Sequence, residues 1–174
     1  MFSDLGALSP LDGRYYSSAK ELNAYFSEAA LMQYRIYVEV EYLLALAKQK
    51  EIRKRLLIDD KEQSKLRKLY QSFDLNAAKE IKEIEKKINH DVKAVEYYIQ
   101  DKTRSSLHPW IHFALTSEDV NNISYSLMWK HALEKVYLPS ALSLQRKLLD
   151  LIREHRKSPM LSLTHGQPAT PTTF

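Results

Sequence analysis

The chain has 174 residues, a formal net charge of +4, no cysteine, and only 3 glycines and 6 prolines. This length allows one domain, or one small domain with part of another, and the scarcity of glycine and proline favours long helices over a many-stranded sheet. Disulfides, thiolate chemistry and sulfur-ligated zinc are excluded, and no run approaches the roughly 20 apolar residues that a membrane span requires.

The N-terminal part predicts a loop followed by a long helix. Residues 1–5 show neither the basic nor the apolar segment of a signal peptide, so we expect a cytoplasmic protein without membrane contact. Apolar residues then recur at steps of three or four, which predicts one continuous helix. They are Leu22, Tyr25, Ala29, Met32, Ile36, Val40, Leu43 and Ala47.

Basic residues gather in the next segment, residues 48–68, where nine lysines and arginines stand against four acids. No aromatic residue for base stacking occurs there before Tyr70, so a solvated helix surface is favoured over a nucleic-acid site. Asp59 or Asp60 is placed to cap a second helix. That helix carries Leu66, Leu69 and Phe73 on its apolar side.

A third helical stripe contains a polar interruption. Its apolar members are Ile81, Ile84, Ile88, Val92, Val95 and Ile99, and Asn89-His90-Asp91 lies between two of them. One interpretation is the polar face of a continuous helix. The other is a hydrogen-bonding triplet at a helix junction, with Asp91 capping the second helix. Spacing alone leaves both open.

The following segment contains a break and then the longest predicted helix. Pro109 ends the pattern, and a short helix is expected from Trp110 to Leu115. His108 and His112 are four residues apart, but no His-Glu-x-x-His pattern is present, so no metal site is expected. Thr116-Ser-Glu-Asp119 then matches a capping box, which opens a helix of about 38 residues.

That helix is longer than a chain of this size needs to cover its own core. Its apolar stripe would be buried more simply against other long helices. The stripe includes Ala141, Leu144, Leu148 and Leu151. We therefore expect the chain to be part of a longer protein. The expected domains are residues 1–107, a helical domain, and residues 108–174, the beginning of a helical bundle.

Two polar loops complete the set of candidate site segments. In Ser9-Pro-Leu-Asp-Gly-Arg-Tyr15, an arginine able to bind carboxylate or phosphate follows a tight turn. In Thr164-His-Gly-Gln-Pro-Ala-Thr-Pro-Thr172, an imidazole that titrates near neutral pH precedes a glycine. The simpler interpretations are a surface turn and a proline-bearing connector.

Four segments, taken together, resemble the adenylosuccinate lyase family in its bacterial form. They are Ser9–Tyr15, Asn89–Tyr97, His112–Asn122 and Thr164–Thr172. The resemblance implies an all-α fold of the fumarase and aspartase superfamily, an N-terminal helical domain followed by a long-helix bundle. It also implies a homotetramer whose active sites are shared between subunits.

The implied reaction is elimination of fumarate from adenylosuccinate, giving AMP, and from succinyl-aminoimidazole-carboxamide ribotide. Such an elimination needs a base, an acid and stabilisation of a carboxylate-bearing anion, so no cofactor is expected. By position in the family motif, His165 corresponds to the general acid.

The resemblance also implies the residues that bind the nucleotide substrate. Those matching the phosphate side are Arg14 and Tyr15, and a second binding segment is Asn89, His90 and Asp91. Those matching the succinyl side are Thr116, Ser117 and Gln167. His90 and Asp91 are also candidates for orienting His165.

One feature of the family is missing from these 174 residues. The serine loop that carries the base, with a Ser-Ser-x-Met-Pro-x-Lys-x-Asn-Pro pattern, does not occur, so we expect the chain alone to lack turnover. Two alternatives stay open. One is a helical oligomerisation scaffold without chemistry, and the other is a sister lyase acting on argininosuccinate or fumarate, although those usually have Thr-His-Leu-Gln at the Thr-His-Gly-Gln position.

Overall fold

The structure, a computed structural model, describes residues 7–173. Contacts divide the chain into two compact units, Met1–Ala132 and Leu133–Phe174. The expectations drawn from residues 1–5 lie outside the described part. Among the described helices, none combines the length and apolarity needed to cross a membrane.

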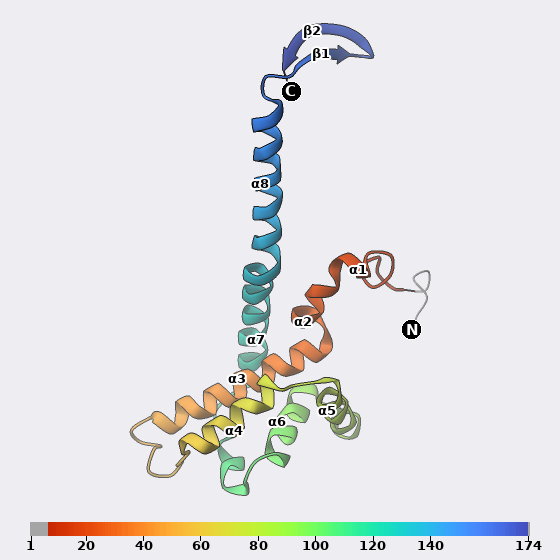
Figure 1. Ribbon diagram of the computed structural model, residues 1–174. Coiled ribbons are helices and arrows are strands. Elements are labelled where there is room, and N and C mark those ends of the chain that lie inside the picture. The colour runs from red at the N-terminus through yellow and green to blue at the C-terminus, as the bar shows by residue number, and fades with distance from the viewer. Residues whose placement is uncertain (1–6, 174) are drawn as a thin grey trace. The chain divides into compact units, whose positions relative to one another are not determined.

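From residue 7 on, where the structure describes it, the first unit contains helices and no strand, as predicted. Its centre is α3, which lies beside α4 and also packs against α6 and α7 (Figure 1). The elements in chain order are α1 (Tyr16–Ala19), the 3₁₀ helix η2 (Lys20–Leu22), α2 (Asn23–Phe26), α3 (Glu28–Lys48), α4 (Asp60–Gln71), α5 (Leu75–Ile88), α6 (Asp91–Asp101), the 3₁₀ helix η3 (Ser105–Trp110) and α7 (Ser117–Ala132).

The expected continuous helix from Leu22 to Ala47 is wrong at its N-terminal end. Ser27 has an extended backbone, with φ −76° and ψ 161°, and separates α2 from α3. Its side-chain oxygen accepts a hydrogen bond from the Ala30 amide at 3.1 Å. The apolar spacing continues across this break, which is why periodicity alone did not reveal it.

We expect Ser27→Ala to lower the free energy of unfolding by about 1 kcal/mol, because the first turn of α3 would lose its cap. Urea unfolding of the 174-residue chain measures this difference. Ser126→Ala is the matched control, since Ser126 lies inside α7 and its hydroxyl bonds the Asn122 carbonyl. Equal losses in the two variants would show that Ser27 has no capping role.

The caps predicted from the sequence are confirmed with one exception. Asp59 caps α4 by accepting from the Glu62 amide at 2.7 Å. The polar triplet does divide the third stripe into two helices, so the junction interpretation is right and the continuous helix is wrong. The cap of α6, however, is His90 rather than Asp91.

The short helix expected after Pro109 is also misplaced. The helical turn is η3, which ends at Trp110 and contains Pro109. A 3₁₀ turn this short requires few backbone amides to donate hydrogen bonds, so it tolerates proline, which has no N–H. His112 and Ala114 in the following turns have positive φ angles of 60° and 56°.

The main hydrophobic core lies where α3 packs against α4, α5 and α6. Its completely buried members include Ile36, Val40, Ile81 and Val95. A second, smaller cluster joins Val38, Val92 and Val120. Val92 follows Asp91 and Val120 follows Asp119, so this cluster anchors the N-terminal turns of α6 and α7 to α3.

The second unit contains the π helix η4 (Leu133–Tyr137), α8 (Leu138–His155), β1 (Pro159–Thr164) and β2 (Gln167–Thr173). The predicted uninterrupted helix is therefore divided by a π-helical turn. None of the residues of α8 is buried. Most of its large apolar side chains are exposed, including Leu144 at 62% and Leu148 at 51%.

The antiparallel hairpin of β1 and β2 was not predicted, since a stiff loop was expected there. Leu163 pairs with Pro168 and Leu161 pairs with Pro171, with an irregularity in the register between the two pairs. Proline cannot donate to a ladder, and a two-stranded ribbon has only edge strands, which tolerate it.

Candidate active site

The sequence-predicted site residues fall into both units. The first unit holds Arg14 and Tyr15 in a loop, Asn89–Asp91 at the start of α6, and Thr116 and Ser117 at the start of α7. His165 and Gln167 belong to the hairpin of the second unit. The geometry is therefore described within each unit.

The triplet before α6 has a conformation typical of a helix junction. Asn89 ends α5 in the left-handed region, with φ 53°. His90 Nδ1 accepts a hydrogen bond from the Lys93 amide at 3.2 Å and lies 3.9 Å from Asp91 Oδ1. The side chains of His90 and Asp91 are each 52% exposed. Both can therefore meet a ligand while the backbone holds them.

An arginine that the sequence analysis did not single out holds this triplet to α7. Arg35 Nη2 donates to Asp91 Oδ2 at 2.7 Å, and Arg35 Nε donates to Asn121 Oδ1 at 2.9 Å. Burial acts to raise the pKa of Asp91, but hydrogen bonds from the Val92 amide and Arg35 outweigh it, and this pKa is lowered. Asp91 is therefore an anion whose position is set from α3.

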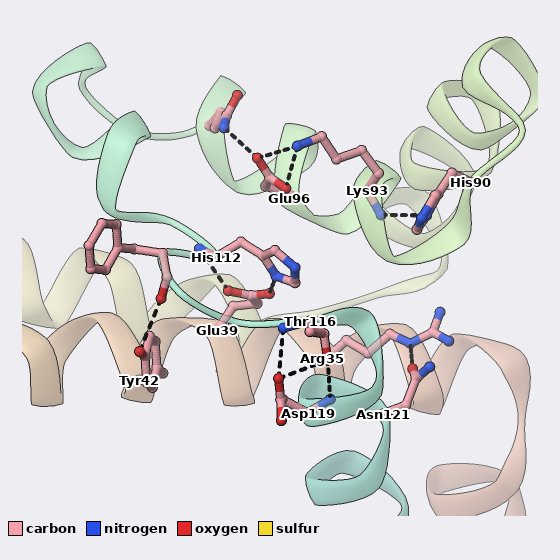
Figure 2. A network of polar contacts seen from close by, with 12 residues as sticks. Arg35, Glu39, Tyr42, His90, Lys93, Glu96, His112, Thr116, Asp119 and Asn121 are labelled. Carbon is pink, nitrogen blue, oxygen red and sulfur yellow. Dashed lines mark hydrogen bonds and ion pairs between the residues drawn. The ribbon is translucent and has the colours of Figure 1, made fainter.

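A buried acid one helical turn further along α3 holds the segment before α7. Glu39 accepts from the amide of His112 at 3.1 Å and contacts His112 Nδ1 at 2.5 Å (Figure 2). Burial raises the pKa of Glu39, and the hydrogen bonds and charge of His112 oppose that effect. Glu39 thereby stabilises the left-handed backbone of His112.

Thr116 and Asp119 form the predicted capping box at the start of α7 (Figure 2). The amide and hydroxyl of Thr116 donate to Asp119 Oδ2 at 2.7 and 2.8 Å, and the Asp119 amide donates back at 3.4 Å. The Thr116 amide and hydroxyl lower the pKa of Asp119. A substrate carboxylate that binds the Thr116 hydroxyl would have to replace Asp119 as its partner.

Arg14 and Tyr15 lie at the end of a hydrogen-bonded turn. The Tyr15 amide donates to the Pro10 carbonyl at 2.9 Å, and the Arg14 guanidinium stands 5.0 Å from the centre of the exposed Tyr15 ring. A cavity of about 560 Å³ beside this loop is lined by Asp12 and Tyr16. Its lining includes none of the residues at the start of α6 or α7.

His165 occupies the tip of the hairpin. His165 and Gly166 have positive φ angles of 50° and 75°, as a type I′ hairpin turn requires. No atom would lie within 4 Å of a Cβ added to Gly166, so the backbone angle and not space explains this glycine. His165 and Gln167 are exposed.

No metal site accompanies these residues in the part of the chain that the structure describes. No group of three or more His, Cys, Asp or Glu side chains in residues 7–173 could hold an ion. His108 contacts the Thr103 carbonyl, and His112 contacts Glu39. The four-residue spacing of these histidines therefore reflects two separate structural contacts.

A family model described as lyase matches residues 13–174. The chain belongs to this lyase family. The match includes Arg14, the start of α6, the start of α7 and the hairpin, so every candidate site residue lies within it.

Curated relatives carry a more specific name. The adenylosuccinate lyase of Legionella pneumophila (strain Philadelphia 1) is 45% identical over 175 residues, that of Escherichia coli (strain K12) 43% over 177, and that of Dictyostelium discoideum 42% over 182. These alignments cover 98–99% of this chain. The chain spans only 38–39% of the length of those relatives.

A solved structure supports the fold. The β-carboxy-cis,cis-muconate cycloisomerase of Acinetobacter calcoaceticus sp. ADP1 matches with a TM-score of 0.63 and 18% sequence identity. The match covers 88% of this chain and 35% of that one. At this identity the likeness concerns the fold alone, and it agrees with the helical architecture predicted from the sequence.

Proposed function

We propose that this chain is the N-terminal part of an adenylosuccinate lyase. The complete protein would eliminate fumarate from adenylosuccinate and from succinyl-aminoimidazole-carboxamide ribotide. The observation that carries the proposal is the identity of 40–45% to proteins of that name over nearly the whole chain. The anchoring of two motif segments, at the starts of α6 and α7, to one buried arginine supports it.

The proposed reaction assigns a task to each segment. A base removes a proton from the carbon beside a succinyl carboxylate, the bond from the adjacent carbon to the purine nitrogen breaks, and His165 protonates that nitrogen. Arg14 is suited to the substrate phosphate because its guanidinium can donate in pairs. Tyr15 lies beside it.

The start of each helix would bind the remaining parts of the substrate. Asn89, His90 and Asp91 would contact the nucleotide, while Thr116 and Ser117, with the amide groups of the first turn of α7, would hold the succinyl carboxylate. In this proposal Gln167 lines the same pocket, and no cofactor takes part. The base belongs to a serine loop outside these 174 residues.

Oligomerisation is part of the proposal, with a cytoplasmic location and a domain boundary near residue 107. The exposed apolar side chains of α8, none of whose residues is buried, favour burial against other long helices. A homotetramer with shared sites would provide such helices.

The test is fumarate release from adenylosuccinate by the complete protein that contains this chain, beside the 174-residue chain alone. We expect the complete protein to give AMP and fumarate in equal amounts, and the chain alone to give none. Appreciable release by the 174-residue chain would refute the role given to the serine loop. A complete protein inactive on adenylosuccinate but active on argininosuccinate would be a sister lyase, and inactivity on both would favour a scaffold.

A further inference from the structure

Few polar side chains are buried in the described part of the chain, and two of them lie on neighbouring turns of α3. The buried polar residues are Arg35, Glu39, Glu96 and Ser124. A buried charge is costly unless it is paired and hydrogen-bonded. Glu96 bonds Lys93 and Gln100 within its own helix, whereas Arg35 bonds two other helices.

Arg35 lies at the meeting point of three helices. Its side chain is 5% exposed. One nitrogen bonds Asp91, the first residue of α6, and another bonds Asn121 in the first turns of α7 (Figure 2 shows the second contact). These partners are 56 and 86 residues away in the sequence. A single guanidinium therefore fixes the starts of two helices relative to α3.

The geometry requires arginine rather than any cation. The guanidinium has five donors in a rigid plane, so Nε and Nη2 reach different acceptors at 2.9 and 2.7 Å. A lysine ammonium is a single point on a flexible chain and would satisfy one of these partners at a time. Lysine at position 35 would keep the charge and lose the bridge.

Only one of the two Asp91 carboxylate oxygens bonds Arg35. Oδ2 bonds Arg35, while Oδ1 lies on the side of His90, and half of the Asp91 side chain is exposed. The buried contact thus positions the carboxylate without covering it. Arg35 itself is buried, whereas the side chains of His90 and Asp91 are half exposed.

We propose that Arg35 is a positioning residue for the lyase site, setting the starts of α6 and α7 in the relative places that substrate binding requires. This inference rests on the proposed function. Arg35 acts through Asp91 and Asn121 and does not touch the substrate. Without the bridge, both segments would bind the substrate with altered geometry, and misplacement of about 1 Å costs on the order of 10- to 100-fold in catalytic efficiency.

The test compares variants of the complete protein with adenylosuccinate as substrate. Arg35→Met is expected to lower kcat/KM by about 10- to 100-fold, mainly through a higher KM, because the lost contacts support substrate binding before and during reaction. Arg35→Lys is expected to restore only part of this loss. The matched control is Arg67→Met. Arg67 lies in α4 and bonds Glu41 of α3, the helix that carries Arg35, at 2.8 and 3.1 Å. This variant should leave KM unchanged.

Thermal unfolding of each variant separates positioning from loss of folding. If Arg35→Met fails to fold, Asn121→Ala replaces it as the test, because this variant removes only the contact of Arg35 with α7. A rise in KM at unchanged melting temperature in Asn121→Ala supports the proposal. An unchanged KM in Arg35→Lys and Asn121→Ala, or equal effects of Arg35→Met and Arg67→Met, overturns it while the proposed function stands. A parent protein inactive on adenylosuccinate overturns both.

Discussion

His165→Asn in the complete protein is expected to lower kcat for fumarate release from adenylosuccinate by about 100-fold or more, the usual contribution of a general acid. The leaving nitrogen would then depart without a proton donor. Substrate binding should change much less than kcat, because the nucleotide and the succinyl group would be held by other residues. Steady-state kinetics that separate kcat from KM measure this.

Asparagine is a better replacement than alanine at this position. His165 has a φ of 50° at the tip of the hairpin. Alanine in that conformation costs about 1 kcal/mol, whereas asparagine is commonly found there. The Asn variant therefore removes the imidazole while keeping the turn, and activity close to the parent's would contradict the assignment of His165 as the acid.

Glu39→Ala is expected to lower the free energy of unfolding by about 3 kcal/mol. The substitution would leave the His112 amide and ring nitrogen without their partner in a partly buried place. It would also open a cavity beside α3. Urea unfolding of the 174-residue chain at neutral pH measures the loss. Glu83→Gln is the control, since that exposed acid pairs with Lys86 one turn along its own helix and should change stability little.

Glu39→Gln tests the same contact through its dependence on pH. Burial raises the pKa of Glu39 above its ordinary value of 4.5. The stability that this group contributes is therefore fully present below pH 4.5 and is lost as pH rises through the raised pKa of the folded state. The glutamine variant lacks this loss, so its stability relative to the parent should increase across that window. A constant difference between the two proteins would show that Glu39 keeps an ordinary pKa.

The parts of the site that depend on near neighbours could be predicted from the sequence. Thr116 and Asp119 are three residues apart, and a capping box forms within one turn whatever surrounds it. The apolar stripe before and after Asn89 likewise predicted helical structure on both sides of the triplet, although spacing left open whether the triplet divides it into α5 and α6. What periodicity missed were breaks that leave the stripe in phase, such as that at Ser27.

The contacts that hold the site together could not be predicted in this way. Arg35 and Glu39 precede Ile36 and Val40 of the apolar stripe by one residue, which was the only available sign that they lie near the buried face of α3. Their partners, Asp91 and His112, are 56 and 73 residues away. Nothing local indicates which distant polar group a buried charge will meet.

The sequence by itself thus determined most of the helices and the caps Asp59 and Thr116, because these depend on residue spacing over a few turns, and it contains the motif segments that resemble adenylosuccinate lyases. Only the tertiary structure decided that α3 supplies the charges holding two of those segments, and that His165 stands in a hairpin turn and not in a plain loop. Long-range pairing of buried charges is settled by packing of the folded chain, which local propensity does not encode. The hairpin strands are largely exposed, and their pairing across the His165–Gly166 turn runs against the low strand propensity of proline, so propensity did not indicate it.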